Sequence, residues 1–128
     1  MKKIGLDIHG VCDSNPEFFS DLSKDLVSTG WEVHIITGPT KAKAIPELEK
    51  YKITYTHFFS IEDYHIARHT PMSYDEKGNP WMDKETWDKT KGEYCQREGV
   101  LLHLDDTEKY KAYFKTSFAS YSAFNKRE

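Results

Sequence analysis

Several residues of the 128-residue chain have the types and spacing needed for phosphoryl transfer. Asp7 precedes a glycine-containing turn, residues 8–11 (IHGV), so its carboxylate is a candidate nucleophile beneath backbone N–H groups that bind phosphate oxygens. The pair Asp105-Asp106 adds carboxylate oxygens, the ligands that Mg²⁺ prefers. Thr37 and the Gly38 amide are candidate hydrogen-bond donors to a phosphate. Together they predict metal-assisted phosphoryl transfer through an aspartyl-phosphate.

The elements that must position these residues alternate between strand and helix patterns. Apolar or alternating stretches predict strands over 3–8, 31–37, 56–61 and 99–106. Helices are predicted over residues 13–30, 40–51, 62–69 and 84–99. Gly30 ends the first of them, and Pro46 must kink or restart the second. In the first helix, Phe18, Phe19, Leu22, Leu26 and Val27 are expected to form a buried face.

Strands that alternate with helices favour an α/β fold. The expected architecture is a Rossmann-like three-layer sandwich with a mostly parallel central sheet and right-handed crossovers. Ligands of such sheets bind beyond the carboxyl ends of the strands. Asp7, Thr37 and Asp105-Asp106 all lie at those ends, so they are expected to converge on one crevice.

Two segments lie outside this alternation of strands and helices. Residues 71–83 carry turn chemistry between aromatic flanks and predict a small hairpin or a loop. Tyr74 and Trp81 flank that turn, and they are candidates either for core packing or for covering the crevice and stacking on a base or sugar. The tail from Thr107 predicts one short helix and an edge strand.

Four motifs in chain order resemble those of the haloacid dehalogenase (HAD) superfamily. LDIHGV with Asp7 matches motif one and HIIT with Thr37 matches motif two. A lysine forms motif three, matched best by Lys91 in KGEYCQREGV and alternatively by Lys89, and LLHLDD matches motif four. The resemblance covers roughly residues 3–108 and implies one HAD-like domain over 1–128, with a minimal cap or none and a small insertion near 71–83.

The resemblance also implies roles for these residues. Asp7 would attack phosphorus, and Mg²⁺ would be held by Asp7, the backbone carbonyl of His9 and an acid of motif four. Asp106 is favoured as the direct ligand, with Asp105 as its outer partner. The phosphate would be bound by the loop and strand-end groups together with the lysine: Gly10, Thr37, Gly38 and Lys91. The implied activity is hydrolysis of a small-molecule phosphate ester.

His9 departs from the pattern of the HAD superfamily. The phosphatases of this superfamily usually carry Asp at that position, two residues after the nucleophile. That Asp protonates the leaving group and then activates water, and imidazole can do the same general acid–base work. Three alternatives follow: a phosphatase that uses His9, an enzyme restricted to good leaving groups, or a catalytically impaired phosphate- and Mg²⁺-binding module. A nucleotide-binding Rossmann domain is disfavoured, because no Gly-x-Gly-x-x-Gly follows the first strand.

Composition limits the class of protein. The chain has 18 basic and 21 acidic residues and a net charge of −3, so nucleic acid is not an expected partner. Mean hydropathy of −0.75 and the lack of a long apolar span argue against a membrane protein, and without a signal peptide a cytoplasmic location is expected. Cys12 and Cys95 are not expected to form a disulfide scaffold. The oligomeric state stays open.

The remaining histidines carry weaker signals. His65 and His69 have the i, i+4 spacing of a zinc-binding helix, but a solvated helix face is the preferred interpretation. His34 and His103 lie inside predicted strands and are expected to be packed rather than to bind a metal.

Overall fold

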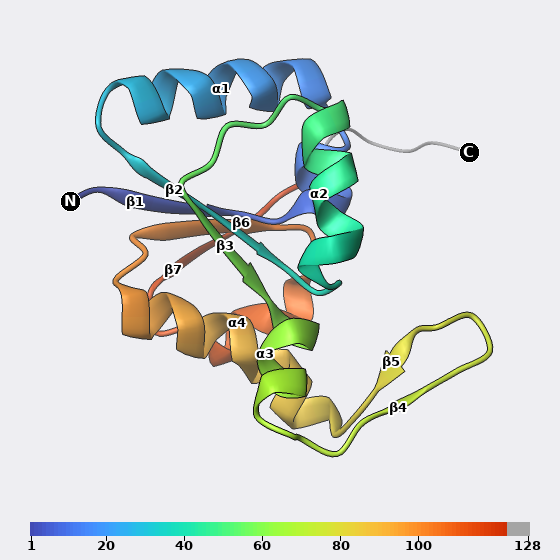
Figure 1. Ribbon diagram of the computed structural model, residues 1–128. Helices are drawn as coiled ribbons and strands as arrows, with labels where there is room; N and C mark the ends of the chain where they lie inside the picture. Colours follow the sequence, from blue (N-terminus) through green and yellow to red (C-terminus); the bar gives the residue numbers. More distant parts are fainter. Residues whose placement is uncertain (123–128) are drawn as a thin grey trace.

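The computed structural model, described here for residues 1–122, is built on a five-stranded sheet with the order β3-β2-β1-β6-β7 (Figure 1). Every neighbouring pair in this sheet is parallel. Its strands are β1 (Lys3–Leu6), β2 (Glu32–Thr37), β3 (His57–Ser60), β6 (Leu102–Asp105) and β7 (Ser117–Ser120). All five carboxyl ends therefore lie at one edge of the sheet.

Helices cover both faces of this sheet, which gives three layers (Figure 1). Helices α1 (Pro16–Ser28) and α2 (Lys41–Lys50) lie on one face. Helices α3 (Ile61–Ala67) and α4 (Lys84–Glu98) and the 3-10 helix η2 (Glu108–Tyr113) lie on the other. The predicted Rossmann-like α/β architecture is confirmed.

The core is divided by the sheet into two apolar clusters. Alternate residues of β2 point to opposite faces, as a strand requires, so Val33 packs beneath α1 and α2 while Ile36 packs on the α4 side. Phe19 is fully buried in the first cluster, whereas Phe18, which was predicted to be buried, is 51% exposed because it lies on the outer side of α1. Cys12 and Cys95 are free thiols, buried in different clusters.

Local sequence signals determine where the helices end. Gly30 and Gly99 adopt positive φ just beyond α1 and at the C-cap of α4. Thr40 caps α2 by accepting a hydrogen bond from the backbone N–H of Lys43. Pro46 was predicted to kink or restart this helix, but α2 continues through it without a break.

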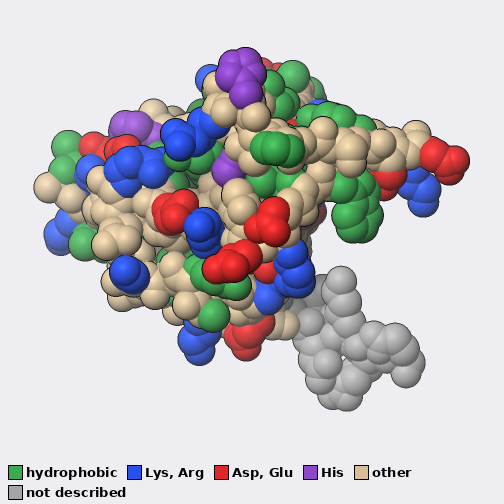
Figure 2. All heavy atoms as spheres, turned by 90° about the horizontal axis from the view of Figure 1, so that it is seen from below, with side chains coloured by type: hydrophobic (Ala, Val, Ile, Leu, Met, Phe, Trp, Pro, Cys, Tyr) green, Lys and Arg blue, Asp and Glu red, His purple; other side chains and the backbone are tan. Residues whose placement is uncertain are grey.

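A two-stranded hairpin, β4 (Ser73–Tyr74) and β5 (Pro80–Trp81), lies between α3 and α4. It projects beyond the rest of the molecule, with charged side chains at its tip and hydrophobic ones along it (Figure 2). Tyr74 is 49% exposed and Trp81 62% exposed, which excludes core packing for both. No helix within residues 1–122 has both the length and the apolar character needed to span a membrane.

Candidate active site

Carboxylates from two adjacent strands converge at the carboxyl edge of the sheet. Oxygens of Asp7, Asp105 and Asp106 all lie within 4.8 Å of one another. The strand pairing explains this convergence, because the N–H of Asp7 donates to the carbonyl of Leu104 at 3.1 Å and so extends the β1–β6 ladder by one residue. Asp7 and Asp105 are buried, whereas Asp106 is exposed.

The chain turns sharply after Asp7, in the short helical turn η1 (Ile8–Cys12). His9 has φ −75° and ψ 123°, and Gly10 has φ 86° and ψ −10°, the dihedral angles of a type II turn. Glycine is favoured at its second position because φ is positive there. A Cβ on Gly10 would also overlap the Asp106 carboxylate, so glycine lets this loop lie against Asp106.

Lys91 links the two buried carboxylates. Its ammonium nitrogen lies 2.6 Å from Oδ2 of Asp105 and 3.3 Å from Oδ1 of Asp7, and the residue is 2% exposed. Helix α4 places Lys91 within reach of both acids. Lys89, the alternative from sequence, forms no ion pair within the part of the chain that the structure describes.

Burial and pairing shift the pKa values of these groups in different directions. Burial raises the pKa of Asp7 above its ordinary value, and the charge of Lys91 only partly opposes this. Burial also raises the pKa of Asp105, but the hydrogen bond from His103 and the charge of Lys91 outweigh it and leave that pKa well below its usual range. For Lys91, burial lowers the pKa, but the charges of Asp7 and Asp105 raise it further.

Asp105 accepts hydrogen bonds from three groups of the protein, whereas Asp106 accepts one. Besides Lys91, His103 Nε2 lies 2.9 Å from Oδ2 of Asp105, and the Thr107 N–H donates to Oδ1 at 2.9 Å. Asp106 accepts from the Thr107 hydroxyl at 3.2 Å and otherwise faces the Gly10 turn. Sequence reasoning missed the link from His103 to Asp105, although their i, i+2 spacing on one strand places both on the same face.

Thr37 ends β2 at the same edge of the sheet. Its hydroxyl is fully buried and has no hydrogen-bond partner among the described residues, which is costly unless a ligand satisfies it. The Gly38 carbonyl accepts the N–H of Glu62 at 3.0 Å, and a Cβ on Gly38 would lie 3.2 Å from the indole of Trp87. The phosphate position expected from sequence is thus bordered by Trp87, which sequence reasoning did not include.

The His9 side chain points to α2 and is half exposed. Its Nε2 lies 3.0 and 3.1 Å from the two carboxylate oxygens of Glu47. This pairing commits Nε2 to Glu47 and leaves Nδ1 as the ring nitrogen available for proton transfer. Glu47 was not predicted, because only the packing of α2 beside the Asp7 loop brings it to His9.

The other histidines differ from the sequence-based interpretation in one respect. His65 is buried, not solvated, and its ring nitrogens lie 2.9 Å from the Thr70 hydroxyl and 2.8 Å from the Thr90 hydroxyl, because α3 packs on α4. His34 is fully buried, as expected, and stacks on His57 with ring centroids 4.2 Å apart and an interplanar angle of 3°. Glu32 lies beside these two histidines, so the three residues form a group that could hold a metal ion. The parallel rings, however, direct their nitrogen lone pairs side by side rather than toward one metal position.

Compared with known proteins, the chain matches no family model, no curated protein and no solved structure.

Proposed function

We propose that this protein is a Mg²⁺-dependent phosphohydrolase of the haloacid dehalogenase type, which hydrolyses a phosphate monoester through an aspartyl-phosphate on Asp7. The observation that carries the proposal is the buried ion-pair chain from Asp7 through Lys91 to Asp105 at the carboxyl edge of a parallel sheet. Buried charges of this kind are costly to retain for stability alone.

The charge balance of the site fits a divalent cation. Three carboxylates face one ammonium group, and burial keeps His103 neutral by lowering its pKa, so negative charge is in excess. Asp7, Asp106 and the backbone carbonyl of His9 would hold Mg²⁺, an oxygen-only set that suits this ion. When bound, Mg²⁺ supplies positive charge that neutralises the phosphoryl oxygens.

Asp7 and the groups around it perform the first step. The Asp7 carboxylate attacks phosphorus, and the bond from phosphorus to the ester oxygen breaks as the bond to Asp7 forms. Lys91 holds Asp7 by its ion pair and offers positive charge to the phosphoryl group. The unpartnered hydroxyl of Thr37, with the Gly38 amide, would bind phosphoryl oxygens.

His9 moves the protons. Protonated at Nδ1, it gives that proton to the leaving oxygen, while its contact with Glu47 orients the ring. In the second step the neutral imidazole takes a proton from water, which attacks the phosphorus of the aspartyl-phosphate. Inorganic phosphate leaves, and Asp7 and protonated His9 are regenerated.

Hydrolysis of p-nitrophenyl phosphate, with and without Mg²⁺, tests the proposal. The good leaving group of this ester needs little protonation, so the formation of the aspartyl-phosphate should depend little on His9. We expect turnover that requires Mg²⁺ and is abolished in Asp7→Asn, with Asp21→Asn, an exposed acid of α1, as the matched control. No turnover above the Asp7→Asn background, together with Mg²⁺ binding by calorimetry, would instead identify a phosphate- and Mg²⁺-binding module.

A further inference from the structure

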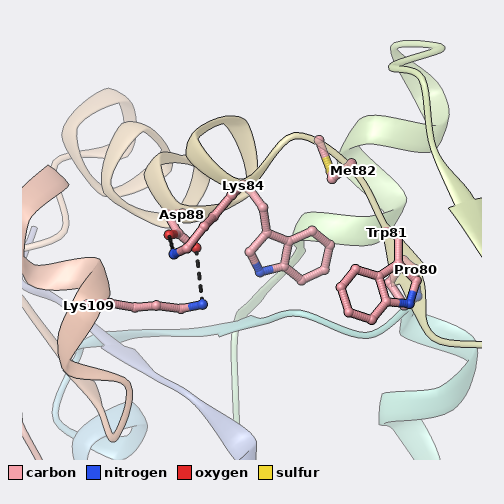
Figure 3. Close-up of a pocket in the computed structure, with 7 residues that line it drawn as sticks. Pro80, Trp81, Met82, Lys84, Asp88 and Lys109 are labelled. Carbon is pink, nitrogen blue, oxygen red and sulfur yellow. Dashed lines mark hydrogen bonds and ion pairs between the residues drawn. The ribbon is translucent and has the colours of Figure 1, made fainter.

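A pocket of about 320 Å³ lies beside the proposed phosphate site, between the hairpin and the start of α4. It is lined by residues 80–82, by Lys84, Trp87 and Asp88 of α4, and by Lys109 of η2. The volume suits a ligand of mononucleotide size. Figure 3 shows Lys84, Asp88 and Lys109 meeting on one side of the pocket, with Trp81 on the other.

The charged side of the pocket presents two ammonium groups to an anion. Asp88 is 3% exposed and lies 2.8 Å from Nζ of Lys84 and 3.5 Å from Nζ of Lys109. The two lysine side chains are themselves 75% and 52% exposed. Because one carboxylate balances one ammonium group, this side keeps a net positive charge, and Asp88 holds both lysines at the pocket.

The opposite side presents an aromatic surface. Trp81 is 62% exposed, and its indole N–H donates to Asp75 at 3.2 Å. The same carboxylate accepts the backbone N–H groups of Lys77 and Asn79, so the hairpin turn and the indole are fixed to one another. A fixed, exposed indole is a ready stacking surface for a planar ring.

Trp87 links the pocket to the proposed catalytic site. Trp87 lines the pocket and borders Gly38, and its indole N–H donates to the Tyr110 hydroxyl at 3.1 Å. The Tyr110 ring in turn lies 5.0 Å from the ammonium group of Lys91. Trp87 and Lys91 are one helical turn apart on α4, about 6 Å along its axis. A substrate with its phosphate near Lys91 would therefore extend its leaving group into the pocket.

We propose that this pocket binds the leaving group of the substrate, and that this group carries a planar aromatic ring and a second anionic group, the chemistry of a nucleoside bisphosphate. The ring stacks on the indole of Trp81, and the second phosphate binds Lys84 and Lys109. The claim that the bound compound is turned over rests on the proposed function, whereas the claim that it binds does not.

Calorimetry on the full-length Asp7→Asn chain with Mg²⁺ tests the pocket, because no ligand is consumed. The ligands are adenosine 3′,5′-bisphosphate, adenosine 5′-monophosphate and glycerol 3-phosphate. We expect the bisphosphate to bind roughly tenfold more tightly than the monophosphate, and both nucleotides more tightly than glycerol 3-phosphate. Trp81→Ala should weaken nucleotide binding about tenfold, whereas Trp81→Phe, which keeps a ring, should change it less than about threefold.

Substitutions of two lysines in the 3-10 helix η2 test whether positive charge in the pocket selects the bisphosphate. Lys109→Gln should remove most of the preference for the bisphosphate, with Asp88 still paired to Lys84, whereas Lys111→Gln, an exposed lysine of the same 3-10 helix, should not. Equal binding of the three ligands, or equal effects of Lys109→Gln and Lys111→Gln, would overturn the proposal that this pocket binds the leaving group. Turnover of p-nitrophenyl phosphate would in that case still support the proposed phosphatase activity. Bisphosphate binding that depends on Trp81 and Lys109 in a chain without turnover would support the pocket and contradict the phosphatase.

Discussion

At the scale of single residues, the ammonium group of Lys91 determines the electrostatics of the site. A buried lysine loses its hydration, which by itself favours the neutral form. Here the charges of Asp7 and Asp105 outweigh that loss and keep Lys91 protonated. The hydrogen bond from His103 and the charge of Lys91 together lower the pKa of Asp105 and keep it ionised despite its burial. Each charge is tolerated only because the others are present, so the three residues act as one unit.

Gly10 is expected to be required for both the turn and the contact with Asp106. Gly10→Ala should lower the free energy of unfolding by about 1–2 kcal/mol because φ is 86°, and by at least about 1 kcal/mol more because its Cβ would overlap the Asp106 carboxylate. Gly78→Ala is the matched control, with φ 81° and open space around it. Urea denaturation measures both, and equal losses would contradict the proposed contact.

His9 should matter most for substrates with poor leaving groups. His9→Ala should slow the formation of the aspartyl-phosphate from an alkyl phosphate, measured in a single turnover, about 100-fold, because the leaving alkoxide then receives no proton. It should slow the formation from p-nitrophenyl phosphate much less. Glu47→Gln should act in the same direction but more weakly, because Glu47 only orients the ring. A uniform loss of this first-step rate on both substrates would show that His9 does not act as the acid.

At the scale of elements, helix α4 contributes residues to both proposed sites. It carries Lys91 of the ion-pair chain and Lys84, Trp87 and Asp88 of the pocket, so its placement aligns the two sites. Its sequence predicts a helix over residues 84–99, and the structure has it over Lys84–Glu98 with Gly99 as the C-cap. Packing decides which residues of α4 face the sheet and which face η2. The many charged residues of this helix leave no strong apolar stripe from which its buried face could be predicted.

Gly92 is expected to set how closely η2 approaches α4. Helix propensity alone would make Gly92→Ala stabilising by about 1 kcal/mol. The added Cβ would instead overlap the backbone carbonyl oxygen of Tyr113, which cannot rotate away as a side chain can. We expect a net loss of about 1–2 kcal/mol in urea denaturation. Gln96→Ala, at an exposed position of α4, should change stability by less than about 0.5 kcal/mol, and a stabilised Gly92→Ala would contradict this packing.

At the scale of the whole molecule, buried histidines should make stability depend on pH. Burial lowers the pKa of His34 and of His65 below the ordinary 6.5. As the pH falls below about 6.5, the unfolded chain binds protons that the folded chain does not, so the free energy of unfolding decreases. Above that pH both states carry neutral histidines, and this contribution to stability is fully present.

The contribution of His65 can be isolated by substitution. His65→Gln should reduce the slope of unfolding free energy against pH between pH 5 and 6.5, by at most about 1.4 kcal/mol per pH unit. His69→Asn is the control, because His69 is exposed and its positive φ is tolerated by asparagine. Chemical denaturation at several pH values measures this, and an unchanged slope in His65→Gln would exclude His65 as a source.

The sequence alone determined the order and type of the elements and the edge at which Asp7, Thr37 and Asp105-Asp106 meet. These follow from local signals: hydrophobic periodicity, helix caps, glycines at helix ends, and the rule that parallel strands end together. Such signals depend on neighbours a few residues away. For that reason they also predicted a small hairpin or a loop over residues 71–83 and the helix that carries Lys91.

Only the tertiary structure decided which side chains touch. The pairing of His9 with Glu47, the burial of His65 between two threonines and the position of Trp87 beside Gly38 all join segments that are distant in the chain. The exposure of Trp81 likewise depends on how the hairpin lies on the rest of the fold. Hydrophobic periodicity shows which face of a helix or strand is buried but not which other element packs against that face. That element is fixed by how whole helices and strands pack together.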